Sequence, residues 1–212
     1  MKLLDPDSKF MRVMSRLADM MLLNLSFLLT CIPIVTVGAS LTALYTVAFK
    51  LDTPKEGRNL KEYFVAFKQN FKQSTIIWLL LAFVGAAVFF DWHLFSSLQG
   101  GTSFISILFI VMLVIWLQVF TLTFPLLSRF DNTTKQTLKN ALILSIAYLP
   151  RVLLMTALNV FPFFLLYESL YLFLYTGFIW LALYFSAVAY FNGKMMKKIL
   201  QNFENKEEEE NA

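Results

Sequence analysis

The side chains that could do chemistry in this chain are ionisable groups that lie in or beside long apolar stretches. Asp19 opens the first such stretch, Arg151 lies near the middle of a later one, and Glu168 stands in a short turn. Asp91 and His93 follow the end of another apolar run. Because hydrocarbon offers charged groups no partner, ionisable residues at membrane depth are costly and are candidates for binding a substrate or a partner.

The two acids beside the first and last stretches also have simple structural explanations. Asp19 lies at helical spacing from Arg12 and Arg16, and we expect it to pair with one of them. Glu168 lies in a very short turn, where an acid is expected to face water. Both acids stay candidates for contact with a substrate or partner.

Arg151 has two interpretations, which differ in its depth in the membrane. A helix that starts at Asn140 would carry Arg151 about 16 Å along its axis, close to the middle of the bilayer. A helix broken at Pro150 would instead leave Arg151 at the headgroups, with its side chain reaching towards water. We favour the break. A deep Arg151 would need Glu168, Asp19 or an anionic substrate as its partner.

Neutral polar residues inside the apolar stretches are expected to hydrogen-bond between helices more often than to line a path. Gln118 and Asn159 are our first candidates for a polar interior. The others are Asn24, Ser26, Thr30, Thr121, Thr123, Ser145 and Ser186.

Catalytic motifs are absent from the sequence. Asp91 and His93 supply too few ligands for a metal site, and Trp92 between them is explained as an aromatic anchor at the membrane surface. There is no Gly-rich phosphate loop, no paired His or Cys ligands, and no serine in a nucleophile elbow. We therefore expect a protein that is not an enzyme, with no catalytic residue, no metal and no cofactor.

Long apolar stretches decide the class of protein. The chain has 212 residues, of which 58% are hydrophobic, 15% are charged and 23 are phenylalanine. An average soluble domain has about 25% charged residues. Residues 104–128 carry no charge, and about 20 apolar helical residues cross a bilayer core of roughly 30 Å. The sequence predicts an all-α polytopic membrane protein.

The first apolar region, 17–49, is too long for one upright span and short for two. Pro33 disfavours helix at Ile32 and removes a backbone donor. We prefer two short helices, at about 17–32 and 36–50, that form a tight hairpin or a re-entrant pair; one long, kinked span is the alternative. Small residues from Gly38 to Thr46 would allow close helix contact in the second half.

The rest of the chain predicts further spans and two surface-lying helices. The spans cover 75–90, 104–128, 141–167 and 170–191. Short amphipathic helices are expected at 10–17 and at 59–74, the second with Leu60, Phe64, Phe67 and Phe71 on one face. Residues 1–200 then form a single integral membrane domain, and the acidic tail 201–212 is expected to be disordered.

The distribution of lysine and arginine predicts the orientation. These residues gather at 1–16, 50–72, 129–139 and 194–198, whereas 91–103 and 168–169 have none. By the positive-inside rule, about six membrane segments with both termini cytoplasmic satisfy every block, and five spans are the alternative. The same rule explains the formal charge of +4 without nucleic-acid binding. The first segment is expected to be an uncleaved anchor.

A family resemblance adds to this interpretation. The stretch CIPIVTVGA at 31–39, together with FKQNF at 67–71, resembles the YesL-like family of bacterial integral membrane proteins of unknown function. The similarity covers most of the chain and is densest over 5–80. It implies a multi-pass protein of a bacterial cell membrane, associated with carbohydrate (oligosaccharide) uptake or utilisation, and it implies no catalytic residues.

Two functions follow as hypotheses. The first is an accessory component that works with the subunits of a carbohydrate importer. The alternative is a small transporter or channel that acts as a homo-oligomer, motivated by the proline-broken first region, Arg151, Gln118 and Asn159. The expected partners are the lipid bilayer, importer subunits and further copies of the chain.

Overall fold

The computed structural model describes residues 9–51, 59–99 and 104–210, and all regular structure in these ranges is helical. The elements in chain order are α1 (Lys9–Cys31), η1 (Ile34–Thr36), α2 (Val37–Ala48), α3 (Asn59–Gln99), α4 (Phe104–Leu127), α5 (Thr134–Ala147), α6 (Leu149–Glu168), α7 (Leu170–Tyr175), α8 (Gly177–Ile179), η2 (Trp180–Tyr184) and α9 (Phe185–Glu210). The prediction of an all-α membrane fold is confirmed.

Four helices are long and apolar enough to cross a membrane. Their apolar parts are Val13–Cys31, Asn59–Leu94, Ile107–Leu127 and Leu149–Glu168. A shorter apolar segment covers Ile34–Ala48. The last predicted span, 170–191, is divided among α7, α8, the π-helix η2 and the start of α9. The counts of six or five segments therefore stay predictions.

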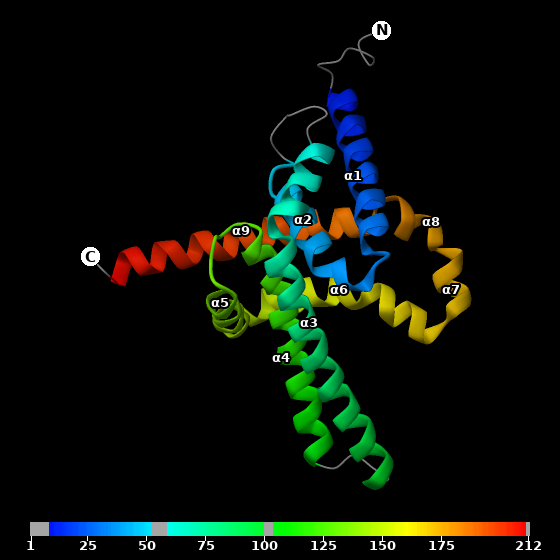
Figure 1. Ribbon diagram of the computed structural model, residues 1–212, viewed down its shortest axis with the longest axis vertical. Helices are drawn as coiled ribbons and strands as arrows, with labels where there is room; N and C mark the ends of the chain where they lie inside the picture. The colour runs from blue at the N-terminus through cyan, green and yellow to red at the C-terminus, as the bar shows by residue number, and fades with distance from the viewer. Residues whose placement is uncertain (1–8, 52–58, 100–103, 211–212) are drawn as a thin grey trace.

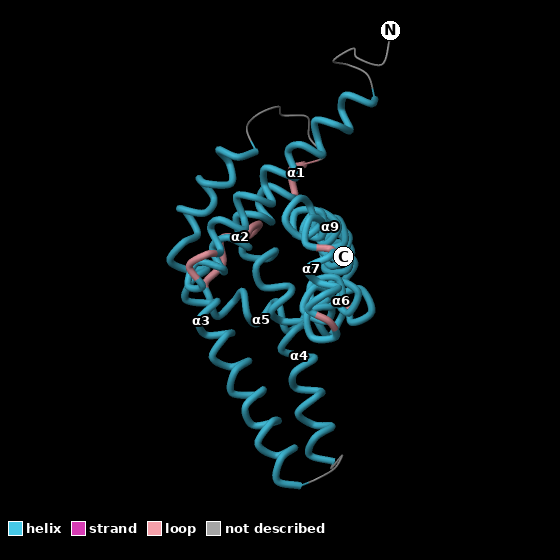
Figure 2. The backbone as a smooth tube through the Cα atoms, turned by 90° about the vertical axis from the view of Figure 1, so that its right-hand side faces the viewer, coloured by secondary structure: helices cyan, strands magenta, loops and turns pink. Residues whose placement is uncertain are grey.

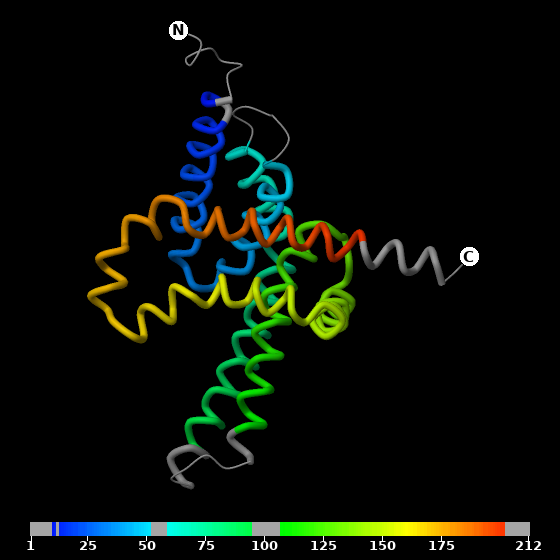
Figure 3. Tube along the Cα trace, turned by 180° about the vertical axis from the view of Figure 1, so that it is seen from behind, coloured from blue at the N-terminus to red at the C-terminus, as the bar shows by residue number. Residues whose placement is uncertain are grey.

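The helices form two crossing groups (Figure 1). The long α3 and α4 run side by side down the longest axis, with α1 at the opposite end. Helices α6 and α9 lie beside each other and cross this group. Figure 2 shows α6 and α9 nearly end-on, and Figure 3 shows them from behind. The α3–α4 arm and the α6–α7 arm thus point away from the centre in different directions.

The break in the first apolar region falls where the sequence predicts it. Helix α1 ends at Cys31, Pro33 precedes η1, and α2 runs back towards the end of the molecule at which α1 begins (Figure 1). Helix α2 has 12 residues. That is about 18 Å of rise, too short to cross a core of about 30 Å. This length fits the re-entrant form of the predicted pair.

Close packing of α2 against α3 depends on small side chains. Ala39, Thr42 and Ala43 are fully buried, and the Thr42 and Ser74 hydroxyls are hydrogen-bonded at 2.9 Å. A Cβ atom on Gly38 would lie 2.4 Å from the backbone oxygen of Ser74. Since no other residue fits this contact, Gly38 sets the distance between the two helices, as small residues do between membrane helices.

Two predicted surface helices are instead continuous with spans. The 10–17 segment is the first part of α1, and the 59–74 segment is the first part of α3. Helix α3 is 41 residues long. Nothing between Asn59 and the apolar run breaks the helix, since that segment contains neither proline nor glycine. The prediction of separate surface helices was therefore wrong.

The apolar face expected in the 59–74 segment is exposed at Phe64 and Phe71, where lipid would contact it. Another face of α3, with Tyr63, Ala66 and Ser74, is buried in the protein. The Tyr63 hydroxyl is hydrogen-bonded to Thr30 on α1 at 2.6 Å, which joins α1 to α3.

At the other end of the chain, α9 continues to Glu210. The expected disordered tail, 201–212, is thus helical over its described part, 201–210. In the middle of α9, the Lys197 ammonium donates to the Phe49 carbonyl at 2.7 Å, which joins α9 to the end of α2. A cation at this position satisfies a carbonyl just beyond the end of α2 and complements the negative end of the helix dipole.

Replacing Gly38 tests whether it sets the α2–α3 distance. We expect Gly38→Ala to lower the free energy of unfolding by about 1–3 kcal/mol, because the added methyl group forces backbone to move. Gly177→Ala is the matched control, since a Cβ atom there meets nothing within 4 Å. Thermal unfolding of both purified variants in detergent measures the difference; equal stability of the two would contradict this role of Gly38.

Candidate functional site

A network of neutral polar side chains lies where α2, α4, α6 and α9 meet. The Asn192 amide donates to the Tyr45 hydroxyl at 3.2 Å and to the Asn159 Oδ1 at 3.1 Å. Asn159 in turn donates to the Thr121 hydroxyl at 3.4 Å, and Thr156 donates to the same oxygen at 3.3 Å. These hydrogen bonds connect all four helices, and each helix contributes one or two residues.

The chemistry of this network is limited to hydrogen bonding. Tyr45 and Asn192 are buried, and the Asn192 Oδ1 has no hydrogen-bond partner among the described residues. Tyr45 and Asn159 also line a cavity of about 30 Å³ beside Tyr184. Such a volume holds about one water molecule, which could satisfy a buried polar group. The network offers neither a nucleophile nor a charged acid or base.

A second polar contact holds the broken last segment to α1. The Asn24 amide donates to the carbonyls of Trp180 at 2.9 Å and Leu181 at 2.7 Å, and its Oδ1 accepts from the Ser186 amide N–H at 3.1 Å. Asn24 is fully buried. A π-helix widens the turn and disturbs the usual backbone pairing. The Asn24 side chain pairs with two carbonyls of η2 and one N–H at the start of α9, which hydrocarbon could not do.

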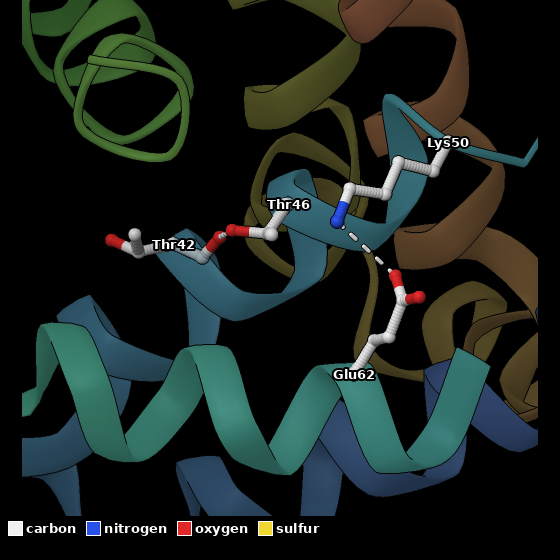
Figure 4. Close-up of polar contacts among 4 residues, drawn as sticks. All are labelled: Thr42, Thr46, Lys50 and Glu62. Atoms are coloured by element: carbon white, nitrogen blue, oxygen red, sulfur yellow. Dashed lines mark hydrogen bonds and ion pairs between the residues drawn. The ribbon is translucent and has the colours of Figure 1, made fainter. Parts of the chain in front are cut away.

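A larger cavity lies at the boundary of α2 and α3, near the basic loops. Its volume is about 250 Å³. A salt bridge of 3.2 Å between the Lys50 Nζ and the Glu62 carboxylate joins the turn after α2 to α3, as Figure 4 shows. The lining consists of Thr46, Lys50, Lys61, Glu62, Val65, Ala66 and Gln69. Charged side chains thus line this cavity, unlike the cavity beside the network.

Arg151 lies at the break that the sequence indicated. Helix α5 ends at Ala147, and α6 begins at Leu149 with Pro150 in its first turn. Arg151 follows directly, is exposed, and has its guanidinium carbon 6.0 Å from the centre of the Tyr148 ring. Arg151 therefore lies in the first turn of α6, as the interpretation with a break at Pro150 expects, and its depth in the membrane stays a prediction.

The two acids are separate from the network. Asp19 accepts a hydrogen bond from Asn59 at 2.8 Å, which joins α1 to the start of α3. The Arg12 side chain, one of its expected partners, lies outside the described part of the structure. Glu168 is exposed at the end of α6.

Of the two polar candidates, Asn159 lies in the network and Gln118 lies next to it. Gln118 is buried on α4, one helical turn before Thr121. Sequence reasoning missed Tyr45, Thr156 and Asn192. Asn192 stands in an otherwise apolar segment, which was a usable signal, whereas Tyr45 looked like one more aromatic residue among many.

Among the described residues, no three His, Cys, Asp or Glu side chains come together in a way that could hold a metal ion. The polar groups that converge are amides and hydroxyls, with lysines and one glutamate at the larger cavity. These groups can bind water, hydroxylated molecules or, at the lysines, an anion.

Comparisons with known proteins find related sequences without a known activity. Residues 20–92 match the family described as "Protein of unknown function, DUF624". The chain is 33% identical over 119 residues to "Uncharacterized protein YteU" of Bacillus subtilis (strain 168). The match covers 50% of this chain and 48% of the relative, so it spans about half the length of each. These similarities support an uncharacterised DUF624-type family rather than the YesL-like proteins in particular. No solved structure matches.

Removing the Asn24 side chain tests its role at η2. We expect Asn24→Ala to lower the free energy of unfolding by about 3 kcal/mol or more, since it leaves several buried backbone groups unpaired. Asn70→Ala is the control, because Asn70 donates only within its own helix, to the Ala66 carbonyl. Hydrogen–deuterium exchange should rise over 180–186 in Asn24→Ala alone. Unchanged exchange there would contradict the assignment.

Proposed function

We propose that this chain is a non-catalytic accessory component of an assembly for oligosaccharide uptake or utilisation in a bacterial cell membrane. The observation that carries the proposal is a closely packed interior combined with two projecting apolar arms. The cavity beside the buried network is about 30 Å³, far below the volume of a sugar. The outer surface, rather than an internal path, is therefore available for function.

The two arms expose large apolar and aromatic side chains. Phe83 on the α3–α4 arm is 77% exposed, and Phe178 on α8, which follows the α6–α7 arm, is 78% exposed. Lipid covers such side chains in an isolated protein. Because the arms diverge (Figure 3), spanning helices of another subunit would fit between them and pack against both, as membrane helices associate through van der Waals contact.

Aromatic residues support the placement of both arm ends at the outer surface of the membrane. Tyr167, Tyr171 and Tyr175 are all highly exposed around the α6–α7 turn, and Trp92 lies in the last part of α3. Tyrosine and tryptophan concentrate at the level of the headgroups. With the basic blocks facing the cytoplasm, both chain termini would lie inside.

The oligosaccharide part of the proposal rests on the YesL-like resemblance. Neither the matched family nor the relative carries a named substrate. What favours an importer as the partner is the association that the resemblance implies, together with arms suited to pack against another membrane protein.

A small transporter or channel, acting as a homo-oligomer, is the second candidate. It is favoured by the broken segment η2, since interrupted helices surround substrate sites in many transporters. The cavity beside Asn159 and Tyr184 lies next to this break. For transport, the network that joins the four helices would have to open.

Site-specific crosslinking distinguishes these functions. We would place a photoreactive phenylalanine analogue at Phe83 or Phe178 in cells grown on an inducing polysaccharide. We expect adducts that contain importer subunits, identified by mass spectrometry. Phe191 on α9 is the control, because it is 58% exposed but lies outside both arms.

The absence of subunit adducts at both Phe83 and Phe178, with lipid adducts alone at Phe178 as at Phe191, would contradict an accessory role. Oligosaccharide flux into liposomes that contain only the purified chain, abolished in Asn159→Leu, would establish the second candidate instead.

A further inference from the structure

The charged cavity between α2 and α3 has the chemistry of an anion site. Lys50 and Lys61 contribute two ammonium groups, and Glu62 contributes one carboxylate. The side chains of Lys50 and Glu62 are 53% and 23% exposed, so their salt bridge lies at the mouth rather than in the core. Among the lining residues two lysines face one glutamate, and this excess of positive charge favours an anion that also accepts hydrogen bonds.

Neutral groups in the same cavity suit a ligand that carries hydroxyls. The Gln69 amide lines it and can both donate and accept. The Thr46 hydroxyl donates to the Thr42 carbonyl at 2.8 Å, and its oxygen keeps the capacity to accept (Figure 4). Val65 and Ala66 complete the lining with apolar surface.

An exposed apolar track continues from this cavity along the same face of α3. Ile76, Leu80 and Phe83 follow Gln69 at helical spacing and are all exposed. Phe83 lies about 21 Å along the helix axis from Gln69, more than half of a hydrocarbon core of roughly 30 Å. A polar cavity that leads into an apolar track of this length matches a headgroup joined to acyl chains.

From this arrangement we propose that the cavity binds the headgroup of an anionic phospholipid, with the acyl chains lying along Ile76, Leu80 and Phe83. The phosphate contacts Lys50 and Lys61, and a glycerol headgroup contacts Thr46 and Gln69. In the unbound state Glu62 pairs with Lys50 and competes with the phosphate. The site includes lysines of the basic block 50–72, and anionic lipid at a membrane surface attracts lysine and arginine.

Native mass spectrometry of the full chain in detergent tests this site, with phosphatidylglycerol or phosphatidylcholine added. We expect tighter binding of phosphatidylglycerol. The double variant Lys50→Gln/Lys61→Gln should weaken that binding about tenfold, and Glu62→Gln should strengthen it. The control Lys135→Gln/Lys139→Gln removes the same charge from exposed positions of α5 and should change it little.

Other results would overturn the site. Equal binding of the two lipids would do so, as would equal losses in the two lysine double variants. Inorganic phosphate or glycerol 3-phosphate displacing phosphatidylglycerol at equal concentration would show a site for a soluble phosphate. If the Lys50→Gln/Lys61→Gln protein does not fold, Glu62→Gln decides alone, since unchanged or weaker phosphatidylglycerol binding in that variant contradicts the proposal.

Discussion

A hydrocarbon surrounding cannot hydrogen-bond to the backbone, and this constraint explains where the polar side chains of the protein lie. Two of the helix breaks inside apolar segments show this. At the first break Thr36 donates to the carbonyls of Thr30 and Pro33. At the second, Asn24 reaches across from α1 to satisfy η2. Each break is possible because a small neutral side chain takes the place that water has in a soluble protein.

The same constraint separates two kinds of polar residue. Neutral groups such as Asn192 and Thr121 lie inside and join helices, where each additional hydrogen bond also fixes the helix arrangement. Arg151, Lys50 and Glu168 are charged and lie at or next to the ends of helices. The described part of the protein thus has a neutral polar network in its interior, and the function proposed above uses the outer surface.

Local chemistry could be predicted from the sequence, whereas long-range pairing could not. The breaks at Pro33 and Pro150 were predictable because proline acts on its immediate neighbours. Close α2–α3 contact was predictable from small side chains such as Gly38. The contact of Asn192 with Tyr45 joins residues 147 positions apart, and no local pattern indicates it. The continuity of α3 was missed because an amphipathic segment was taken for a separate helix, although no residue there ends one.

We infer that the α3–α4 and α6–α7 arms cross the membrane with the basic blocks 50–72 and 129–139 on one side. Cysteine labelling with a membrane-impermeant maleimide tests this orientation for the α6–α7 arm in a Cys31→Ser background. Glu168 and Lys135 are both exposed, at opposite ends of the α5–α6 region, so each can be replaced by cysteine. We expect Glu168→Cys to be labelled in intact cells and Lys135→Cys only after the membrane is permeabilised. Labelling of both positions from the same side would contradict it.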